Sequence, residues 1–345
     1  MKYWDIGKIL AYQRNFNFIN GERSIGKTYT TIKFCINRAI TRGQEFVYIV
    51  RTQYEKLNNA LELALQKVLM NEFPELNIKF TTEKATVTTE NENGQKTTIT
   101  LAYCLALTEA VKIKKMSFPN VKYMIFDEYM LEENRNTRYV DGWREPDLLL
   151  NIYHTIDREE DRVIVFMLGN NTSFYLNPYH RHAAFNIPKI DKGKIWTSEN
   201  VLFQWAEATE ELKQEKSKSK FIKMISDSEY GQYAAKGEYI NDVTDFVEIR
   251  PNSARPYFTI LYESEKYGIW YDAKTGYVFI DDRYDPSIPS IYALTLADHT
   301  EDTVLVNKAN SNCIKWLSKM YKLGNVKFTS MKIKAKAEQM FRIIC

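Results

Sequence analysis

The sequence predicts an α/β fold, a mostly parallel β-sheet with helices on both faces, followed by a smaller α+β domain. Short apolar segments alternate with amphipathic helical segments over about the first 205 residues, an order typical of parallel sheets with crossover helices. A glycine-containing loop joins the first predicted strand to a helix. The 345 residues, 44% hydrophobic and 26% charged, fit about two globular domains and exclude a wholly disordered or fibrous chain.

The spacing of apolar residues predicts the elements of the first domain. A helix opens the chain, because Ile6, Ile9 and Leu10 lie at helical spacing. The segment 77–107 is rich in Thr, Ile and Val and contains Asn93-Gly94, a strong hairpin signal. The other predicted elements are, in order, strand 16–20, helix 27–42, strand 45–51, helix 54–73, strand 121–126, helix 143–160 and strand 162–168.

The composition changes after about residue 205, and this predicts the domain limits. Residues 207–224 are highly charged and predict a solvated helix between domains. Beyond residue 245, antiparallel strands are expected at 257–263, 267–272, 276–281 and 290–296, with a helix at 307–323. We therefore expect a first domain at 1–205, a helical linker at 206–244 and a second domain at 245–345.

Composition also excludes several classes of protein. No apolar stretch reaches the roughly 18 residues that span a bilayer. The N-terminus lacks the layout of a secretory signal, and four scattered cysteines with four histidines disfavour a zinc site. We expect a reduced protein of the cytoplasm without a membrane partner.

Charge is distributed unevenly along the C-terminal part of the chain. Residues 251–302 carry four Lys/Arg against nine Asp/Glu, whereas residues 303–345 carry nine against one. A basic end indicates an anionic partner, although a solvated amphipathic face would give the same pattern.

The loop Gly21–Thr28 (GERSIGKT) matches the phosphate-loop pattern GxxxxGK[ST] between a predicted strand and a predicted helix. Gly21 and Gly26 let the backbone turn its N–H groups toward phosphate, and Lys27 can reach the β- and γ-phosphates of ATP. The Thr28 hydroxyl suits Mg²⁺. The loop residues Arg23 and Ser24 complete the predicted nucleotide contacts, and Arg23 could instead reach a neighbouring subunit. The pattern predicts a P-loop NTPase.

Asp127 and Glu128 follow an apolar strand about a hundred residues downstream. Alone they could be solvated strand-end carboxylates. Together with the phosphate loop they match the Walker B pattern, in which the aspartate holds the Mg²⁺ shell and the glutamate polarises water. This favours the additional-strand, catalytic-glutamate (RecA-like) division, which inserts a strand between the two Walker strands. Strand material for it is available at 101–107 besides 45–51.

Further candidates surround the next strand. Asn170 follows it and could sense the γ-phosphate or simply form a turn. Ring ATPases also take an arginine from a neighbour to stabilise the transition state, and Arg158 and Arg162 precede this strand. Lys114 and Lys115, before the Walker B strand, are equally ambiguous.

These features resemble the DNA-packaging ATPase family of short-tailed phages of the phi29 type, over nearly the whole chain. The resembling segments are GERSIGKT with Ile36-Asn37-Arg38, QEFVYIVR, Phe118–Val121 leading into IFDE, Leu149-Leu150-Asn151 with Arg158, Gly268–Asp272, Tyr277–Asp282, Asp285-Pro286-Ser287 and Tyr292–Thr295.

The resemblance implies a homopentameric ring at the procapsid portal that drives double-stranded DNA into the capsid with ATP. It implies that Arg158 acts on a neighbour's ATP and suggests Lys114 as a second residue acting in trans. The family also uses a packaging RNA at the portal vertex. The expected location is the host cytoplasm, with transient docking on the procapsid.

The resemblance further implies a C-terminal ribonuclease-H-like domain. A two-metal nuclease needs several acids, the first inside its first strand, but the segment 257–262 (YFTILY) contains none. Asp272, Asp281, Asp282, Asp285 and Asp298 form no complete set. We therefore expect an inactive nuclease fold that binds nucleic acid through basic side chains, namely Lys327, Lys332, Lys334 and Lys336.

For the pore of a translocating ring, the candidates are Arg51, at the end of a strand, and Lys56, in the next helix. A solvated helix charge is the simpler interpretation of Lys56.

Alternative functions are a P-loop phosphotransferase with a small-molecule acceptor, a terminase with an active nuclease, and a non-catalytic nucleotide-gated binding protein. The Walker B glutamate and the basic C-terminus favour the motor.

Overall fold

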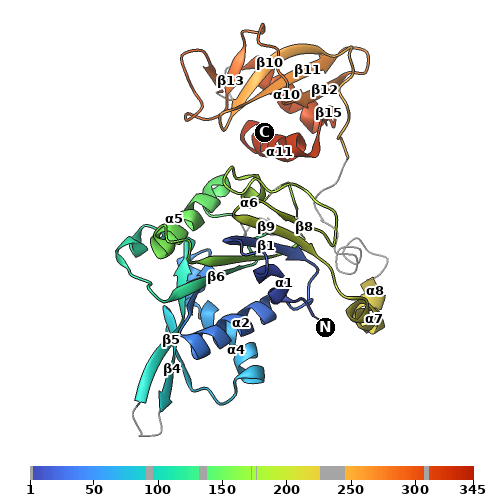
Figure 1. Cartoon of the computed structure of the whole chain (residues 1–345). Coiled ribbons are helices and arrows are strands. Elements are labelled where there is room, and N and C mark those ends of the chain that lie inside the picture. The colour runs from blue at the N-terminus through green and yellow to red at the C-terminus, as the bar shows by residue number, and fades with distance from the viewer. Residues whose placement is uncertain are drawn as a thin grey trace. The chain divides into compact units, whose positions relative to one another are not determined.

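The computed structural model describes residues 3–90, 96–131, 138–171, 173–175, 177–225, 245–306 and 311–345. The chain divides into two compact units, Met1–Asn241 and Asp242–Cys345 (Figure 1). The division falls inside the segment 206–244 that we predict as a linker. Asn93-Gly94, the predicted hairpin turn, lies outside the described residues.

The first unit is built on a nine-stranded sheet with strand order β3-β4-β5-β2-β6-β7-β1-β9-β8. The pairs from β5 through β9 in this order are all parallel, and β3, β4 and β8 add antiparallel margins. The strands are β1 (Phe16–Gly21), β2 (Glu45–Val50), β3 (Ile78–Phe80), β4 (Lys84–Glu90), β5 (Lys96–Ala106), β6 (Val121–Asp127), β7 (Ile164–Asn170), β8 (Ile195–Thr197) and β9 (Val201–Ala206).

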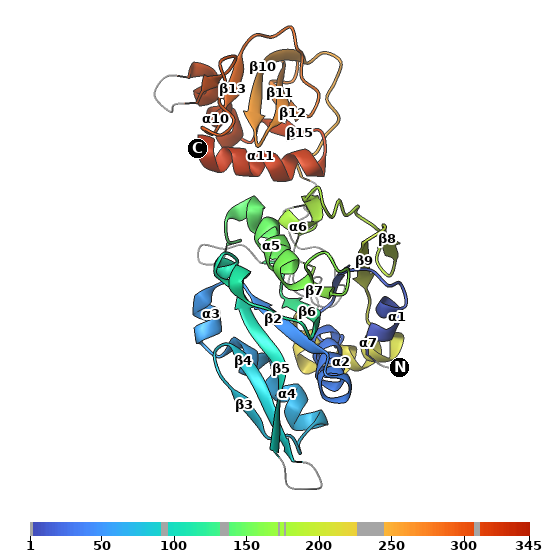
Figure 2. The same cartoon turned by 60° about the vertical axis from the view of Figure 1, so that its left-hand side comes forward.

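Helices cover both faces of this sheet (Figures 1 and 2). One apolar core contains residues of α1 (Ile6–Leu10), α2 (Lys27–Arg42) and α4 (Ala60–Glu72). The other contains residues of α5 (Glu145–Asp157) and α6 (Pro178–Arg181). Neighbouring residues of β1 contribute to both cores, Phe18 to one and Ile19 to the other, so this central strand is buried on both of its faces. The predicted α/β fold is confirmed.

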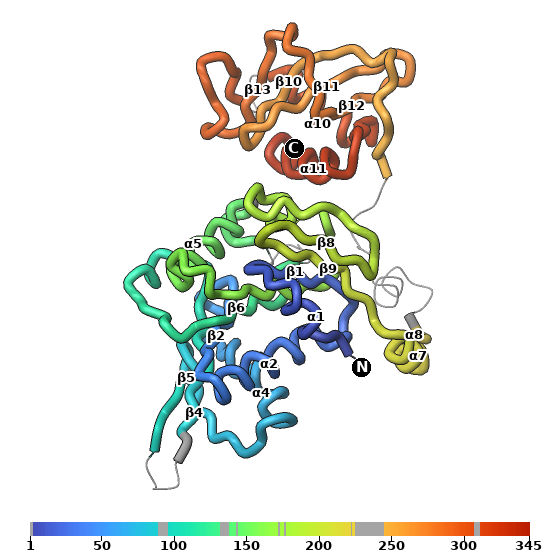
Figure 3. The backbone as a smooth tube through the Cα atoms, in the orientation of Figure 1, coloured from blue at the N-terminus to red at the C-terminus, as the bar shows by residue number. Residues whose placement is uncertain are grey.

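The strand inserted between the two Walker strands is β7, which pairs with β6 on one side and β1 on the other. We expected strand material at 101–107, besides 45–51, to supply it, and this expectation is wrong. Residues 96–106 form β5, which pairs with β2 and lies farther from β1. The inserted strand follows Walker B in the chain. After β6 the chain passes through α5 (Figure 3) and then returns to the middle of the sheet as β7.

The predicted helix at 54–73 is divided into α3 (Gln53–Leu57) and α4. Asn59 lies between them with φ of 60°, in the left-handed region that asparagine tolerates better than most residues. The charged segment 207–224 likewise forms two helices, α7 (Glu210–Lys218) and α8 (Lys220–Ile225), which Ser219 separates.

The second unit contains a six-stranded sheet in the order β14-β13-β10-β11-β12-β15 with helices packed on it. Its elements are β10 (Arg255–Tyr262), β11 (Glu265–Asp272), β12 (Tyr277–Asp281), β13 (Ile291–Ala293), β14 (Val304–Leu305), α10 (Asn312–Lys322), β15 (Val326–Phe328) and α11 (Met331–Ile344). We did not predict β15 and α11. Among the described helices of both units, none has the length and apolarity that crossing a lipid bilayer requires.

Candidate functional site

A pocket of about 920 Å³ lies at the carboxyl ends of β1, β6 and β7, within the size range of small-molecule sites. It brings together residues that are far apart in the sequence, as a nucleotide site on a parallel sheet requires. Eight predicted site residues line it, namely Arg23, Ser24, Gly26, Lys27, Thr28, Asp127, Glu128 and Asn170. Lys67, Asn71 and Glu72 of α4 line it as well.

The two glycines of the loop are required by its geometry. A Cβ on Gly21 would lie 2.7 Å from the carbonyl oxygen of Ala206 on β9, so any side chain would displace that strand. Gly26 has φ of 94° and precedes the first residue of α2. It therefore turns the chain in the left-handed region just where the helix N-terminus faces the pocket.

Lys27 is almost fully buried, and its ammonium group is held by the loop itself. Its Nζ donates to the carbonyl oxygens of Gly21 (3.1 Å) and Glu22 (2.9 Å). Burial lowers the pKa of Lys27 to about 8, against the opposing charge of Asp127. A phosphate in this pocket would give the ammonium an anionic partner and so relieve the cost of burial.

Asp127, at the end of β6, lies next to Thr28 at the start of α2. Burial raises the pKa of Asp127 to about 6, and a hydrogen bond from the Thr28 hydroxyl opposes that rise. A hydroxyl and a carboxylate at hydrogen-bond distance supply the hard oxygen ligands that Mg²⁺ prefers. These two residues therefore fit a magnesium ion whose other ligands come from phosphate and water.

Glu128 is exposed at the pocket and has φ of 53°, a conformation that a non-glycine residue adopts at an energetic cost. Its amide donates to Asp127 Oδ1 at 3.0 Å, and its own carbonyl accepts from Arg51 Nη1 at 2.8 Å. The carbonyl of the next residue, Tyr129, accepts from Arg51 Nη2 at 2.6 Å. A single guanidinium therefore holds the backbone of this turn.

Arg51 is buried, with 7% of its surface exposed, and its position corrects our expectation that it faces DNA. Its Nε pairs with Glu145 Oε1 at 3.2 Å, and its guanidinium lies over the ring of Phe126. Glu145 also accepts from the Tyr179 hydroxyl at 2.9 Å and the Val140 amide at 2.6 Å. Each of the three guanidinium nitrogens of Arg51 donates to a partner within the chain, so Arg51 is a structural cation of the turn that follows β6.

Lys56 is also directed inward and does not support a DNA contact. It is 8% exposed, and its Nζ pairs with Glu109 at 2.9 Å. In the second unit, Lys336 is buried and paired with Glu263, and Lys327 pairs with Glu248 at 3.3 Å. Of the C-terminal candidates, Lys332 is exposed and Lys334 is half-buried.

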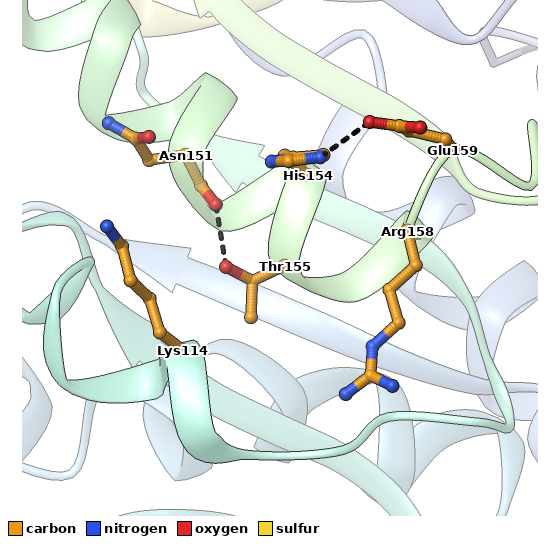
Figure 4. A pocket seen from close by; sticks show the side chains of 6 residues that line it. All are labelled: Lys114, Asn151, His154, Thr155, Arg158 and Glu159. Carbon is orange, nitrogen blue, oxygen red and sulfur yellow. Dashed lines mark hydrogen bonds and ion pairs between the residues drawn. The ribbon is translucent and has the colours of Figure 1, made fainter.

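A second pocket, of about 480 Å³, contains both predicted trans residues (Figure 4). It shares no lining residue with the first pocket and is lined by Lys114, Asn151, His154, Thr155, Arg158 and Glu159. Arg158 ends α5 with φ of 56° and donates to the Met116 carbonyl at 3.3 Å. Within the part of the chain that the structure describes, this is the one hydrogen bond of its guanidinium, and Figure 4 shows Arg158 beside Thr155 among the lining side chains. Most of its five donors therefore stay available to a ligand or a partner.

Arg162, the alternative arginine, is used within the chain. Its guanidinium donates to the carbonyl oxygens of Phe118 (3.1 Å) and Val121, and also to that of Ile156. The structure thus separates the two arginines, because Arg158 faces a surface pocket and Arg162 ties β6 and α5 together. Lys115 is exposed but does not line the pocket.

A buried polar network behind the nucleotide pocket was missed by sequence reasoning. The Tyr129 hydroxyl contacts the side chain of Asn20, the residue before Gly21, and lies 2.7 Å from His180 Nε2. His180 Nδ1 lies 3.1 Å from the Phe174 carbonyl. Gly169 of β7 lies against the same tyrosine, because a Cβ there would come within 2.8 Å of Tyr129 Cε1. The network joins both Walker strands.

Comparison with known proteins gives one consistent result. The family model described as podovirus DNA encapsidation protein (Gp16) matches residues 1–344. The DNA packaging protein of Bacillus phage phi29 is 28% identical over 344 residues, which cover 99% of this chain and 97% of that protein. The DNA packaging protein of Bacillus phage B103 is 28% identical over 337 residues, covering 97% of this chain and 98% of the relative.

Solved structures are similar over the full length. A chain of the bacteriophage Phi-29 viral genome packaging motor assembly superimposes with a TM-score of 0.74 at 27% identity, covering 100% of both chains. The Phi-28 gp11 DNA packaging motor has a TM-score of 0.62 at 18% identity, covering 99% of this chain and 98% of that chain. The second similarity concerns the fold alone.

The Arg51–Glu145 pair should be essential for stability. We expect Arg51→Met to lower the free energy of unfolding by about 3–5 kcal/mol, because it leaves a buried carboxylate and two buried carbonyls without their partner. The double variant Arg51→Met/Glu145→Gln should recover part of that loss. Urea denaturation measures both, and an Arg51→Met protein as stable as the wild type would contradict the assignment.

His180 should make the first unit sensitive to acid. Burial lowers the pKa of His180 to about 3, so below about pH 6.5 the unfolded chain binds a proton that the folded chain does not. The contribution of His180 to stability must then fall as the pH falls. From pH 7.5 to 5.5 we expect the wild type to lose about 1.4 kcal/mol more than His180→Gln, and His154→Gln to follow the wild type. Equal pH slopes in urea denaturation of the wild type and His180→Gln would refute this.

Proposed function

The chain belongs to the podovirus DNA encapsidation protein (Gp16) family, and we propose that it is the ATPase subunit of a ring motor that drives double-stranded viral DNA into a procapsid. The observation that carries the proposal is the composition of the nucleotide pocket. A phosphate loop, a hydroxyl–carboxylate pair suited to Mg²⁺ and a glutamate suited to activating water line the same cavity.

The names of the relatives support the partners that we propose. They are DNA packaging proteins of phages, and one solved relative belongs to a genome packaging motor assembly. We accordingly propose double-stranded DNA, the portal of the procapsid and further copies of this chain in a pentameric ring, with a packaging RNA as an additional partner. The motor would work in the host cytoplasm while docked on the procapsid.

The proposed chemistry assigns one task to each residue of the pocket. The loop N–H groups bind phosphate oxygens, and Lys27 moves its ammonium from the loop carbonyls to the β- and γ-phosphates. Thr28 and Asp127 would hold Mg²⁺, which when bound neutralises charge on the phosphate oxygens. Glu128 orients the attacking water and accepts its proton on the carboxylate. Asn170, at the end of β7, is the proposed γ-phosphate sensor.

Arg158 and Lys114 are proposed to complete a neighbouring subunit's site. Both line a pocket separate from the chain's own nucleotide pocket, and Arg158 keeps donors available there. A guanidinium that enters from a neighbour stabilises charge on the transferred phosphoryl group. Hydrolysis then depends on contact between subunits.

A motor that passes every sequence must contact phosphate, so its DNA affinity should fall steeply with salt. In the second unit, Lys332 and Lys334 remain the proposed nucleic-acid contacts.

We also propose that this second unit is a vestigial, ribonuclease-H-like domain. Its acids have structural partners, since Asp281 pairs with Arg250 at 3.0 Å and Asp298 accepts from the Ser264 amide at 2.8 Å.

Hydrolysis of ATP should require Glu128 and respond to DNA. We expect Glu128→Gln to lower the DNA-stimulated rate at least about 100-fold, because the amide cannot accept the proton of water. Binding of Mg·ADP should change little. Phosphate release with and without double-stranded DNA of unrelated sequences measures this. A high rate that is indifferent to DNA and to Glu128→Gln would favour a phosphotransferase instead.

Subunit mixing tests the trans role of Arg158. We expect Arg158→Ala to lower the rate about a thousandfold or more, while Lys115→Ala, next to the second pocket, stays near wild type. Rings that mix Arg158→Ala with Lys27→Ala subunits should be more active than either alone, because each intact site can then meet an intact arginine. Mixed rings of verified assembly without any recovery would exclude a trans role.

A further inference from the structure

A lysine outside the phosphate loop is bonded directly to it. Lys216 lies on α7, 193 residues after Arg23, and its Nζ donates to the Arg23 carbonyl at 2.7 Å. The same ammonium group pairs with Glu22 Oε2 at 3.4 Å. The other carboxylate oxygen of Glu22 lies 3.0 Å from Nζ of Lys192.

Glu22 is an unusual residue for this position, because it is a buried acid inside a loop that has to bind phosphate. Only 3% of it is exposed, and a buried carboxylate is stable only when it is paired. The two lysines supply that pairing and make the net charge of the three groups positive. The acid therefore adds no net repulsion against phosphate, and it fixes the position of the Lys216 ammonium.

The bond to the Arg23 carbonyl determines where the following amide points. The carbonyl of Arg23 and the N–H of Ser24 belong to one planar peptide group and point in opposite directions. Lys216 holds the carbonyl from the side of α7, so the Ser24 N–H is directed the other way. Ser24 lines the nucleotide pocket, where inward N–H groups bind phosphate.

This peptide orientation also has to be maintained against backbone strain. Ser24 has φ of 62°, in the left-handed region that favours glycine. A charge-assisted hydrogen bond from an ammonium group to the adjacent carbonyl stabilises that conformation before any nucleotide arrives. The loop is thereby preorganised, which lowers the cost of binding.

We propose that Lys216 is a positioning residue of the nucleotide site, which holds the Arg23–Ser24 peptide with its N–H toward phosphate and makes nucleotide affinity depend on the place of α7. The proposal rests on the proposed function, since it concerns the same ATP pocket. Because the loop contacts the phosphates that ATP and ADP share, the affinity for both nucleotides should depend on Lys216.

The test measures binding of Mg·ADP and Mg·ATP to the full chain by calorimetry, with Glu128→Gln as background for ATP. We expect Lys216→Met to weaken both nucleotides about tenfold, the effect of losing one charge-assisted bond. Lys216→Arg, which can donate to the same carbonyl, should restore most of the affinity. The matched control is Lys213→Met in the same helix, because Lys213 pairs with the exposed Glu210 at 2.8 Å.

A role in the stability of α7 alone would give a different result. Lys216→Met would then lower the melting temperature while its nucleotide affinity stayed within twofold of Lys213→Met, and that outcome overturns the inference. A wild-type chain that binds no Mg·ADP would instead refute the proposed function, and the inference with it. In steady state, the change in Lys216→Met should appear in KM rather than in kcat.

Discussion

The turn after β6 depends on the guanidinium of Arg51. One planar group, at the end of β2, binds the carbonyls of Glu128 and Tyr129 and pairs with a carboxylate of α5. The turn places Glu128 at the pocket in a left-handed conformation, which needs outside support. An arginine suits this position, because its five donors form a rigid fork that can reach two successive carbonyls and a carboxylate at the same time. The geometry of the proposed general base is thus set by a residue of the neighbouring strand.

Several charged side chains near this turn are buried or half-buried, and two of them, Lys27 and Asp127, lie where a phosphate and a divalent cation would bind. Burial shifts the pKa of Lys27 down and that of Asp127 up, so each charge is costly without a partner. Glu22 would be costly as well, but it has its lysine partners already within the fold. The pocket and the loop beside it thus contain two kinds of buried charge. Those that are paired internally shape the loop, and those that are incompletely paired favour the arrival of phosphate and a divalent cation.

The sequence predicted the candidate site best where the chemistry requires particular residues to be adjacent in the chain. The phosphate loop and the carboxylates after β6 were predicted because their functions require contiguous residues, and the structure places them in one pocket. The interpretation of Arg51 was wrong because its partner Glu145 lies 94 residues away, and no local pattern shows which way a guanidinium turns. The helix α11 was missed because we assigned its lysines to nucleic-acid binding and did not follow the apolar spacing between them, although Ile333, Met340 and Phe341 form a buried face. The position of β7 between β1 and β6 and the hydrogen bond from Lys216 to the phosphate loop could not be predicted either. Both bring together segments that are far apart in the sequence, and no local pattern of residues indicates such a contact.

Because Gly169 has no side chain, the inserted strand β7 can pack closely against the turn that follows β6. The phenol ring of Tyr129 fills the space in which a Cβ of residue 169 would stand, and the same ring reaches Asn20 and His180. A side chain at position 169 therefore fits only if residues 129 and 130 both give up volume. In related chains, alanine or serine at position 169 should accompany smaller residues at positions 129 and 130. Correlated substitutions of this kind would reflect the close packing of β7 against the turn that follows β6.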